Sequence, residues 1–164
     1  MLKNIGLILS IIIFGITLFA VDSTARNAED AYFRGNHFWS LKDYRNAIKW
    51  YSRASKAGYG AASYKVGMMH SRGLGTAVNS QTAVRWYKKA ASQRYHPAMY
   101  QLGVVYASGR GIGQDSVQAY MWFGLAERMG NKIAHARMDA LEKNMDKRDI
   151  VKSLKLIEES FGKP

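Results

Sequence analysis

Histidine is the side chain best suited to hold a metal ion or move a proton near neutral pH, and the sequence has four. They stand at His37, His70, His96 and His135. No two are separated by the four residues that bring metal ligands onto one face of a helix. Cysteine is absent, which excludes disulfides, thiolate zinc sites and a cysteine nucleophile. We therefore expect no metal site and no bound cofactor.

Three other patterns could suggest an enzyme, and each has a simpler interpretation. The glycines at Gly109, Gly111 and Gly113 resemble part of a dinucleotide-binding loop, but no predicted strand precedes them. Glu158 and Glu159 are adjacent on a predicted helix, so they point about 100° apart and are poorly placed for paired acid–base work. No Gly-x-Ser-x-Gly nucleophile motif occurs. We identify no catalytic residue and predict that the protein is not an enzyme.

An internal repeat determines which elements position the side chains. A shift of 36 residues superposes one stretch of the chain on the next, as in repeat proteins. The matched positions hold small or aromatic residues: Ala47, Ala83 and Ala119; Trp50, Trp86 and Trp122; Tyr51, Tyr87 and Phe123; Ala54, Ala90 and Ala126; Ala62, Ala98 and Ala134; Gly67 and Gly103. Because the tryptophans recur with the repeat, we assign them to packing rather than to a ligand cage.

Each repeat is predicted to contain two helices joined by a glycine loop. Ala83, Tyr87 and Ala90 lie three and four residues apart, which places them on one helical face. The residues before these second helices can cap free N–H groups. They are Asp43, Asn79 and Asp115. The sequence predicts six helices in three antiparallel pairs, followed by a C-terminal cap.

The last predicted helix carries apolar residues at three- and four-residue steps, which indicates a stripe that covers the end of the repeats. These residues are Ile150, Val151, Leu154, Ile157 and Phe161.

Residues 58–93 and 94–129 resemble two Sel-one-like repeats, a subclass of tetratricopeptide-like repeats, through the order Ala, Leu-Gly, Tyr, Gly-x-Gly, Asp, Ala, Trp-Tyr and Ala-Ala. Residues 26–57 resemble a plain tetratricopeptide unit without the glycine loop, and residues 130–164 resemble closing helices. Arg94 stands where the pattern usually has a turn glycine. The resemblance implies an all-α, right-handed α-solenoid of antiparallel helix pairs. It implies an adaptor or scaffold without specifying the partner.

Residues 1–25 are predicted to be a targeting segment. Sixteen uncharged, mostly apolar residues run from Ile5 to Ala20, after a single side-chain charge at Lys3. As a helix they would span roughly 24 Å, short of the roughly 30 Å hydrocarbon core. This favours a signal peptide cleaved near Ala20 or Ala25, with a periplasmic or secreted body. The alternative is an inner-membrane anchor with the body outside the cytoplasm.

A tyrosine stands three residues before each repeat-related glycine, at Tyr32, Tyr64 and Tyr100. In tetratricopeptide-like folds this position looks into the concave groove where ligands lie. We therefore expect a partner-binding groove formed by these tyrosines and Met68. The alternative is that the tyrosines only help to stack the first helices of the repeats.

The charge distribution is uneven. From Tyr44 to Gln114 the chain has eleven Lys and Arg residues and no Asp or Glu, within a total net charge of +12. A solvated face normally mixes both signs. We predict a basic surface on the second helices of the repeats, although a high isoelectric point could also be only a general feature of exported proteins. Its residues are Arg45, Lys49, Arg53, Arg85, Lys88 and Lys89.

Together these features predict a non-enzymatic scaffold outside the cytoplasm that binds an acidic protein partner. An anionic envelope glycan or a membrane surface are alternative partners. A second hypothesis is a regulatory or glycan-binding subunit of a cell-envelope enzyme that acts on peptidoglycan or polysaccharide. Nucleic acid would explain the charge, but it conflicts with the leader and no nucleic-acid motif accompanies it.

Overall fold

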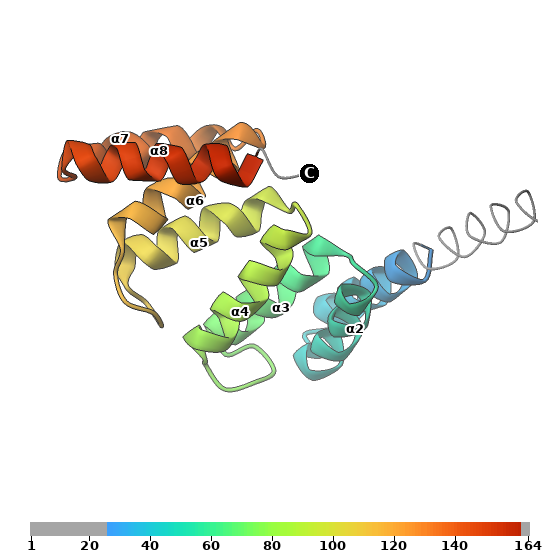
Figure 1. Cartoon of the computed structure of the whole chain (residues 1–164). Helices are drawn as coiled ribbons and strands as arrows, with labels where there is room; N and C mark the ends of the chain where they lie inside the picture. Colours follow the sequence, from blue (N-terminus) through green and yellow to red (C-terminus); the bar gives the residue numbers. More distant parts are fainter. Residues whose placement is uncertain (1–25, 162–164) are drawn as a thin grey trace, which may run out of the picture.

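The computed structural model describes residues 26–161, so the predicted leader, residues 1–25, lies outside the described residues. Residues 26–40 are helical, and we call them the N-terminal helix. Seven further helices follow, as labelled in Figure 1: α2 (Tyr44–Lys56), α3 (Gly60–Arg72), α4 (Ser80–Ser92), α5 (His96–Ser108), α6 (Ser116–Arg128), α7 (Lys132–Glu142) and α8 (Lys147–Phe161). No strand occurs between residues 26 and 161, and the predicted all-α class is confirmed.

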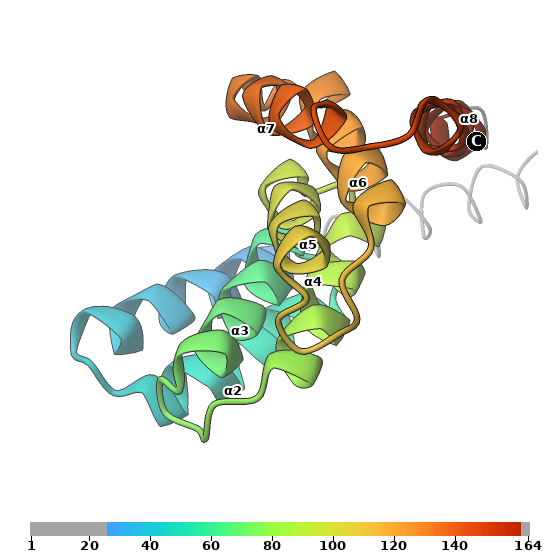
Figure 2. The same ribbon diagram turned by 90° about the vertical axis from the view of Figure 1, so that its left-hand side faces the viewer.

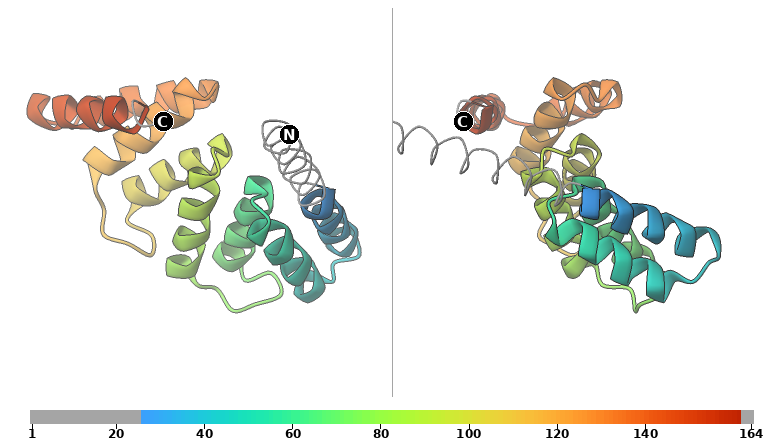
Figure 3. Two further views of the ribbon diagram at one scale, coloured as in Figure 1. Left: turned by 45° about the vertical axis from the view of Figure 1, so that its right-hand side comes forward. Right: turned by 90° about the vertical axis from the view of Figure 1, so that its right-hand side faces the viewer.

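The helices stack as antiparallel pairs in a solenoid. Helix α3 packs on α4 and α5 packs on α6, while α2 on α3 and α4 on α5 join one pair to the next. The N-terminal helix and α8 lie at opposite ends of the stack (Figures 1 and 3). Helices α7 and α8 both pack on α6, from different sides (Figure 2). The predicted α-solenoid with closing helices is confirmed.

Polar caps begin the second helix of each pair, as predicted. The side chains of Asp43, Asn79 and Asp115 accept hydrogen bonds from the backbone N–H three residues later, at 3.2, 2.8 and 2.9 Å. The first helices of the two pairs with glycine loops end at Gly73 and Gly109, where φ is 72° and 69°. Glycine adopts this left-handed conformation without a Cβ penalty, so the loops can turn tightly.

Within each pair, an aromatic ring of the second helix lies directly against a glycine of the first. A Cβ placed on Gly103 would lie 2.6 Å from the Phe123 ring, and one on Gly67 would lie 2.8 Å from the Tyr87 ring. Both distances are shorter than van der Waals contact, so only glycine fits at this helix crossing. Gly35 meets the ring of Tyr51 in the same way. Between the last two pairs the 36-residue repeat is therefore a repeat of this contact, whereas in the first unit, which lacks the glycine loop, the glycine stands 32 residues before Gly67.

Helix α8 closes the solenoid through a narrower contact than the sequence predicts. Ile157 is 2% exposed and its side chain packs at Gly124 of α6, and the Ser153 hydroxyl donates to the backbone oxygen of Val117 at 3.2 Å. Val151 and Leu154 are 66% and 44% exposed, so their expected burial in the stripe is wrong. The helix lies on α6 at a crossing that buries only part of its apolar face.

We expect Gly103→Ala to lower the free energy of unfolding by about 1–3 kcal/mol, because the methyl group overlaps the Phe123 ring. Helix propensity alone would favour alanine by about 1 kcal/mol, so the sign of the change distinguishes packing from propensity. Urea denaturation measures it. Gly113→Ala is the control, since a Cβ there meets nothing within 4 Å. Stabilisation by Gly103→Ala would contradict the packing argument.

We expect Ile157→Ala to lower the free energy of unfolding by about 2–4 kcal/mol, because it opens a cavity at the contact between α8 and α6. Val151→Ala on the same helix removes an exposed side chain and should change stability by less than about 0.5 kcal/mol. Thermal unfolding of the two variants tests the comparison. Equal losses would mean that α8 closes the solenoid through a different face.

Candidate partner-binding site

The three predicted groove tyrosines are half-buried, and their rings lie tilted against the aromatic rings of the second helices. Tyr64 lies 5.7 Å from Tyr87 and Tyr100 lies 5.4 Å from Phe123, measured between ring centroids. Tyr32 makes the same contact with Tyr51, at 5.6 Å. Each tyrosine thus has a packing role on one side of its ring. That the tyrosines also contact a partner remains a prediction.

Two further tyrosines that the sequence analysis missed join this row. Tyr59 and Tyr95 occupy the N-cap positions of α3 and α5, where neither side chain caps the helix. Tyr59 lies 4.7 Å from Tyr32, and Tyr95 lies 5.5 Å from Tyr64. Burial raises the pKa of Tyr95 above its usual value, as do the neighbouring tyrosines. The two residues are 36 apart, so the repeat itself could have identified them.

The fourth predicted groove residue is Met68, and its repeat relative on α5 lies at a pocket. Met68 is half-buried one turn after Tyr64, and Val104 occupies the repeat-related position on α5. Val104 lines a pocket of about 280 Å³ between α5 and α7, with Phe123 in its lining. Arg137 of α7 also lines it and donates from Nε to the hydroxyl of Tyr100 at 3.2 Å. This pocket offers apolar surface with one cation, Arg137.

The six predicted basic residues lie on α2 and α4, and we call them the basic surface. All are exposed except Lys89, which is half-buried. Several rest on aromatic rings: the Arg53 guanidinium lies 5.5 Å from the Trp50 ring, and the Lys89 ammonium lies 5.2 Å from the Trp86 ring. These cation–π contacts restrict the long side chains. The half-buried tryptophans pack inward as predicted, and they also support the cations.

Part of the basic surface is hollow. Arg45 and Lys49 line an open pocket of about 420 Å³ between α2 and the loop after α3, together with His70. The Nδ1 atom of His70 is buried without a hydrogen-bond partner. Burial and then the charge of Arg85 lower the pKa of His70, so the ring is neutral at neutral pH. The hollow therefore presents two cations and can accept an anionic group.

Within residues 26–161, no three His, Cys, Asp or Glu side chains are placed so that together they could hold a metal ion. His135 is exposed and lies between two carboxylates. Its Nδ1 is 2.9 Å from Glu127, and its Nε2 is 3.8 Å from Asp139. Asp139 follows His135 by four residues, a pairing that the sequence analysis overlooked. Both contacts lie on the protein surface, where such interactions contribute little to stability.

The fold is similar to solved structures of repeat proteins. A protective antigen with an SLR fold from uropathogenic Escherichia coli gives a TM-score of 0.76 at 26% identity over 83% of this chain, which spans only 30% of that antigen. A Sel1 repeat protein from Oxalobacter formigenes gives 0.65 at 25% identity, covering 76% of this chain and 98% of that one. Cysteine rich protein B of Helicobacter pylori shares the fold alone, with a TM-score of 0.56 at 19% identity over 71% and 93%.

A comparison with proteins of curated function gave no match. The family model of the Sel1 repeat matches residues 26–59, 60–95 and 96–131, which is more than half of the chain. The first of these stretches is the unit that lacks the glycine loop. Proteins with such repeats generally act as non-catalytic scaffolds for protein interactions. With the helix pairs, the glycine–aromatic crossings and three matched repeats, this chain belongs to the Sel1 repeat family.

Proposed function

We propose that this protein is a non-enzymatic scaffold that works outside the cytoplasm and binds an acidic protein through the basic surface of α2 and α4. The whole activity of any longer relative is not implied, because the chain spans 30% of the Escherichia coli antigen. The proposal depends on charge placement rather than on any reactive group.

One observation carries the proposal: the cations of the basic surface have no carboxylate at ion-pair distance among residues 26–161. Hydrogen bonds from Asn46 are the main cause of the lowered pKa of Asp43, and the charge of Lys49 is only a minor one. None of the six forms an ion pair with another described residue. The helices between Tyr44 and Gln114 contain no carboxylate that could supply one. By contrast, carboxylates of α8 are paired: Glu158 with Arg128 of α6, and Glu159 with Lys155 of α8 itself.

Unpaired like charges cost stability in the free protein through mutual repulsion. An acidic partner would relieve this repulsion and would gain charge-assisted hydrogen bonds. Arg53 and Lys89 are already restricted on their tryptophans, so binding would order them at a reduced entropic cost. The hollow at Arg45 and Lys49 would seat one of the partner's carboxylates.

The location of the scaffold is inferred from the leader. The charge-poor apolar segment of residues 1–25 supports export, and its short span supports cleavage. Within residues 26–161, the structure has no helix with the length and apolar character needed to cross a membrane.

We expect reversal of four repeat-related cations to slow association with the native partner by at least about tenfold, because distributed charge steers encounter. The variant replaces Lys49, Arg53, Arg85 and Lys89 with Glu. Surface plasmon resonance with the partner isolated from the host envelope measures the on-rate. Wild-type binding should also weaken steeply above 0.15 M salt, where the Debye length is about 8 Å or less.

The matched control reverses four exposed cations of the closing helices, so both variants lose the same charge. They are Lys132, Lys143, Lys147 and Lys152. Melting temperatures of both variants monitor the fold. Equal on-rates for the two variants, or binding that does not respond to salt, would sink the proposal.

We expect the mature protein to begin shortly after Ala20 or after Ala25, because the apolar segment is too short for a stable span. Intact-mass measurement of the protein from the native host checks this. A mature species that retains Met1 or Leu2 would indicate an anchor, and a cytosolic location would contradict export.

A further inference from the structure

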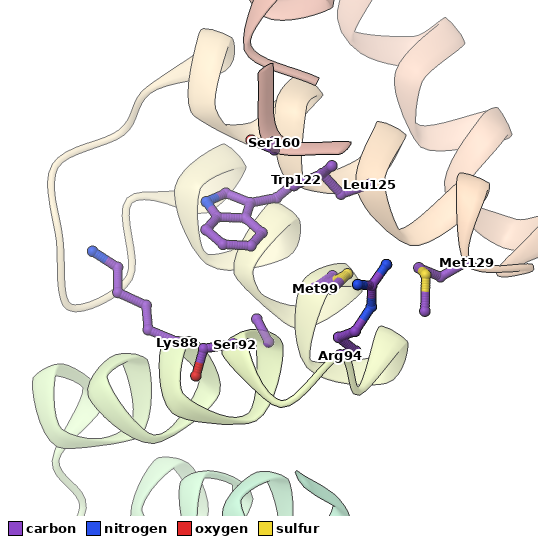
Figure 4. A pocket seen from close by; sticks show the side chains of 9 residues that line it. Lys88, Ser92, Arg94, Met99, Trp122, Leu125, Met129 and Ser160 are labelled. Atoms are coloured by element: carbon purple, nitrogen blue, oxygen red, sulfur yellow. The ribbon is translucent and has the colours of Figure 1, made fainter. Parts of the chain in front are cut away.

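A pocket of about 310 Å³ opens where α4, α5, α6 and the end of α8 meet. Its centre is apolar and is formed by Met99 and the Trp122 ring. Two cations, Lys88 and Arg94, lie at its sides (Figure 4). The remaining lining residues are Ala91, Ser92, Leu125, Met129 and Ser160. This volume is about twice that of a cavity that binds benzene, so a large apolar side chain fits.

The repeat supplies an internal comparison, because the same place one repeat earlier is bridged by hydrogen bonds. Ser55 and Ser63 are buried there, and their hydroxyls are hydrogen-bonded at 2.7 Å. Ser63 also donates to the side-chain oxygen of Gln93 at 2.7 Å, and the Gln93 amide donates to the backbone oxygen of Ser55 at 3.2 Å. This network closes the junction between the first two helix pairs.

The corresponding positions 36 residues later cannot form that network. They hold Ala91, Met99 and Met129, which line the pocket and have no hydroxyl or amide in their side chains. Lys89 is likewise replaced by Leu125. The second junction has thus exchanged a closed polar contact for an open apolar one, while the glycine–aromatic crossings are kept.

A fifth difference is Arg94, which adopts a left-handed conformation with φ of 58°. Its repeat relatives are Gly58 and Gly130, with φ of 92° and 93°. A side chain other than glycine is strained in this region, and such strain often accompanies a function. The guanidinium of Arg94 reaches between Met99 and Met129 (Figure 4). An arginine thus occupies a glycine position and places its charge at the pocket.

The pocket's two cations, Arg94 and Lys88, form no ion pair with any residue in the described part of the chain. Glu158, on the nearby end of α8, is paired with Arg128. The pocket therefore combines an apolar interior with two positive charges that have no ion-pair partner among the described residues. Lys88 also belongs to the basic surface, so the pocket and that surface are continuous.

We propose that this pocket is the specificity site of the scaffold, where it binds a large apolar side chain of the partner next to a carboxylate. The inference rests on the proposed function, since the pocket adjoins the surface that would dock an acidic protein. The apolar side chain enters between Met99 and Trp122, and the carboxylate accepts hydrogen bonds from Arg94. The basic surface attracts the acidic partner, and the pocket selects partners whose sequence has a large apolar residue beside an acidic one.

Peptide display on the purified protein tests the proposal, followed by fluorescence anisotropy with the selected peptides. The expected peptides carry Phe, Trp, Leu or Met beside Asp or Glu. Arg94→Gly should weaken them by about tenfold or more, through loss of a charge-assisted hydrogen bond. The substitution places glycine where the two related turns have Gly58 and Gly130. Glycine adopts the left-handed conformation without strain, so the melting temperature of the variant should equal or exceed that of the wild type.

A second variant copies the closed junction into the open one by combining Ala91→Ser, Met99→Ser and Met129→Gln. It should abolish peptide binding while leaving the response of partner docking to salt unchanged. Arg110→Ser is the charge control, because it removes one cation of the acid-free segment away from the pocket. It should bind within about twofold of wild type.

Selected peptides that bind Arg94→Gly as tightly as wild type would overturn the pocket proposal. Selection of peptides that lack an apolar residue beside an acidic one would also overturn it. If vesicles containing phosphatidylglycerol bind and lose binding in Arg94→Gly while no peptide is selected, the pocket serves a lipid and the proposal fails. Loss of docking in the charge-reversal variant with unchanged Arg94→Gly binding would leave the basic surface intact as a proposal and remove only the pocket.

Discussion

The contact between a glycine of the first helix and an aromatic ring of the second determines how each pair is built. Gly67 against Tyr87 and Gly103 against Phe123 leave no room for a Cβ, so the two helices approach closely at a fixed point. The same rings also pack against Tyr64 and Tyr100 of the first helices, at centroid distances of 5.7 and 5.4 Å. Because the crossing recurs with the repeat, Lys49 and Arg53 of α2 have repeat-related counterparts in Arg85 and Lys89 of α4.

Most of the fold could be predicted because the repeat is strict where this crossing requires it. Small and aromatic residues recur every 36 residues, and the capping residues recur with them, so period and helix starts could be identified without the structure. The position of α8 could not be predicted from the sequence. The repeat ends before it, so no register relates its stripe to a neighbour. Its place depends on one small residue, Gly124, which admits Ile157 and leaves Leu154 outside.

The candidate sites were predictable only in part. Charge and helical spacing could place Lys49 and Arg53 on one helix face, because exposure follows from the amphipathic pattern. Their support by tryptophans depends on side-chain rotamers, which spacing does not determine. Tyr59 and Tyr95 were missed because they lie outside the expected helix face, in turns. The pocket was missed for a different reason: it is a place where side-chain atoms are lacking.

In a repeat protein each unit serves as a control for the next, so departures from the repeat are informative. Positions needed by the fold stay constant, as the crossing glycines do, whereas a position free of that requirement can change. Replacing Ser63 and Gln93 with methionines removes three hydrogen bonds at one junction, and placing Arg94 at a glycine turn adds strain. Both changes occur at the same pocket, and the left-handed conformation of Arg94 disfavours the free protein. A ligand of the kind proposed for this pocket would compensate that strain, which does not improve the solenoid itself.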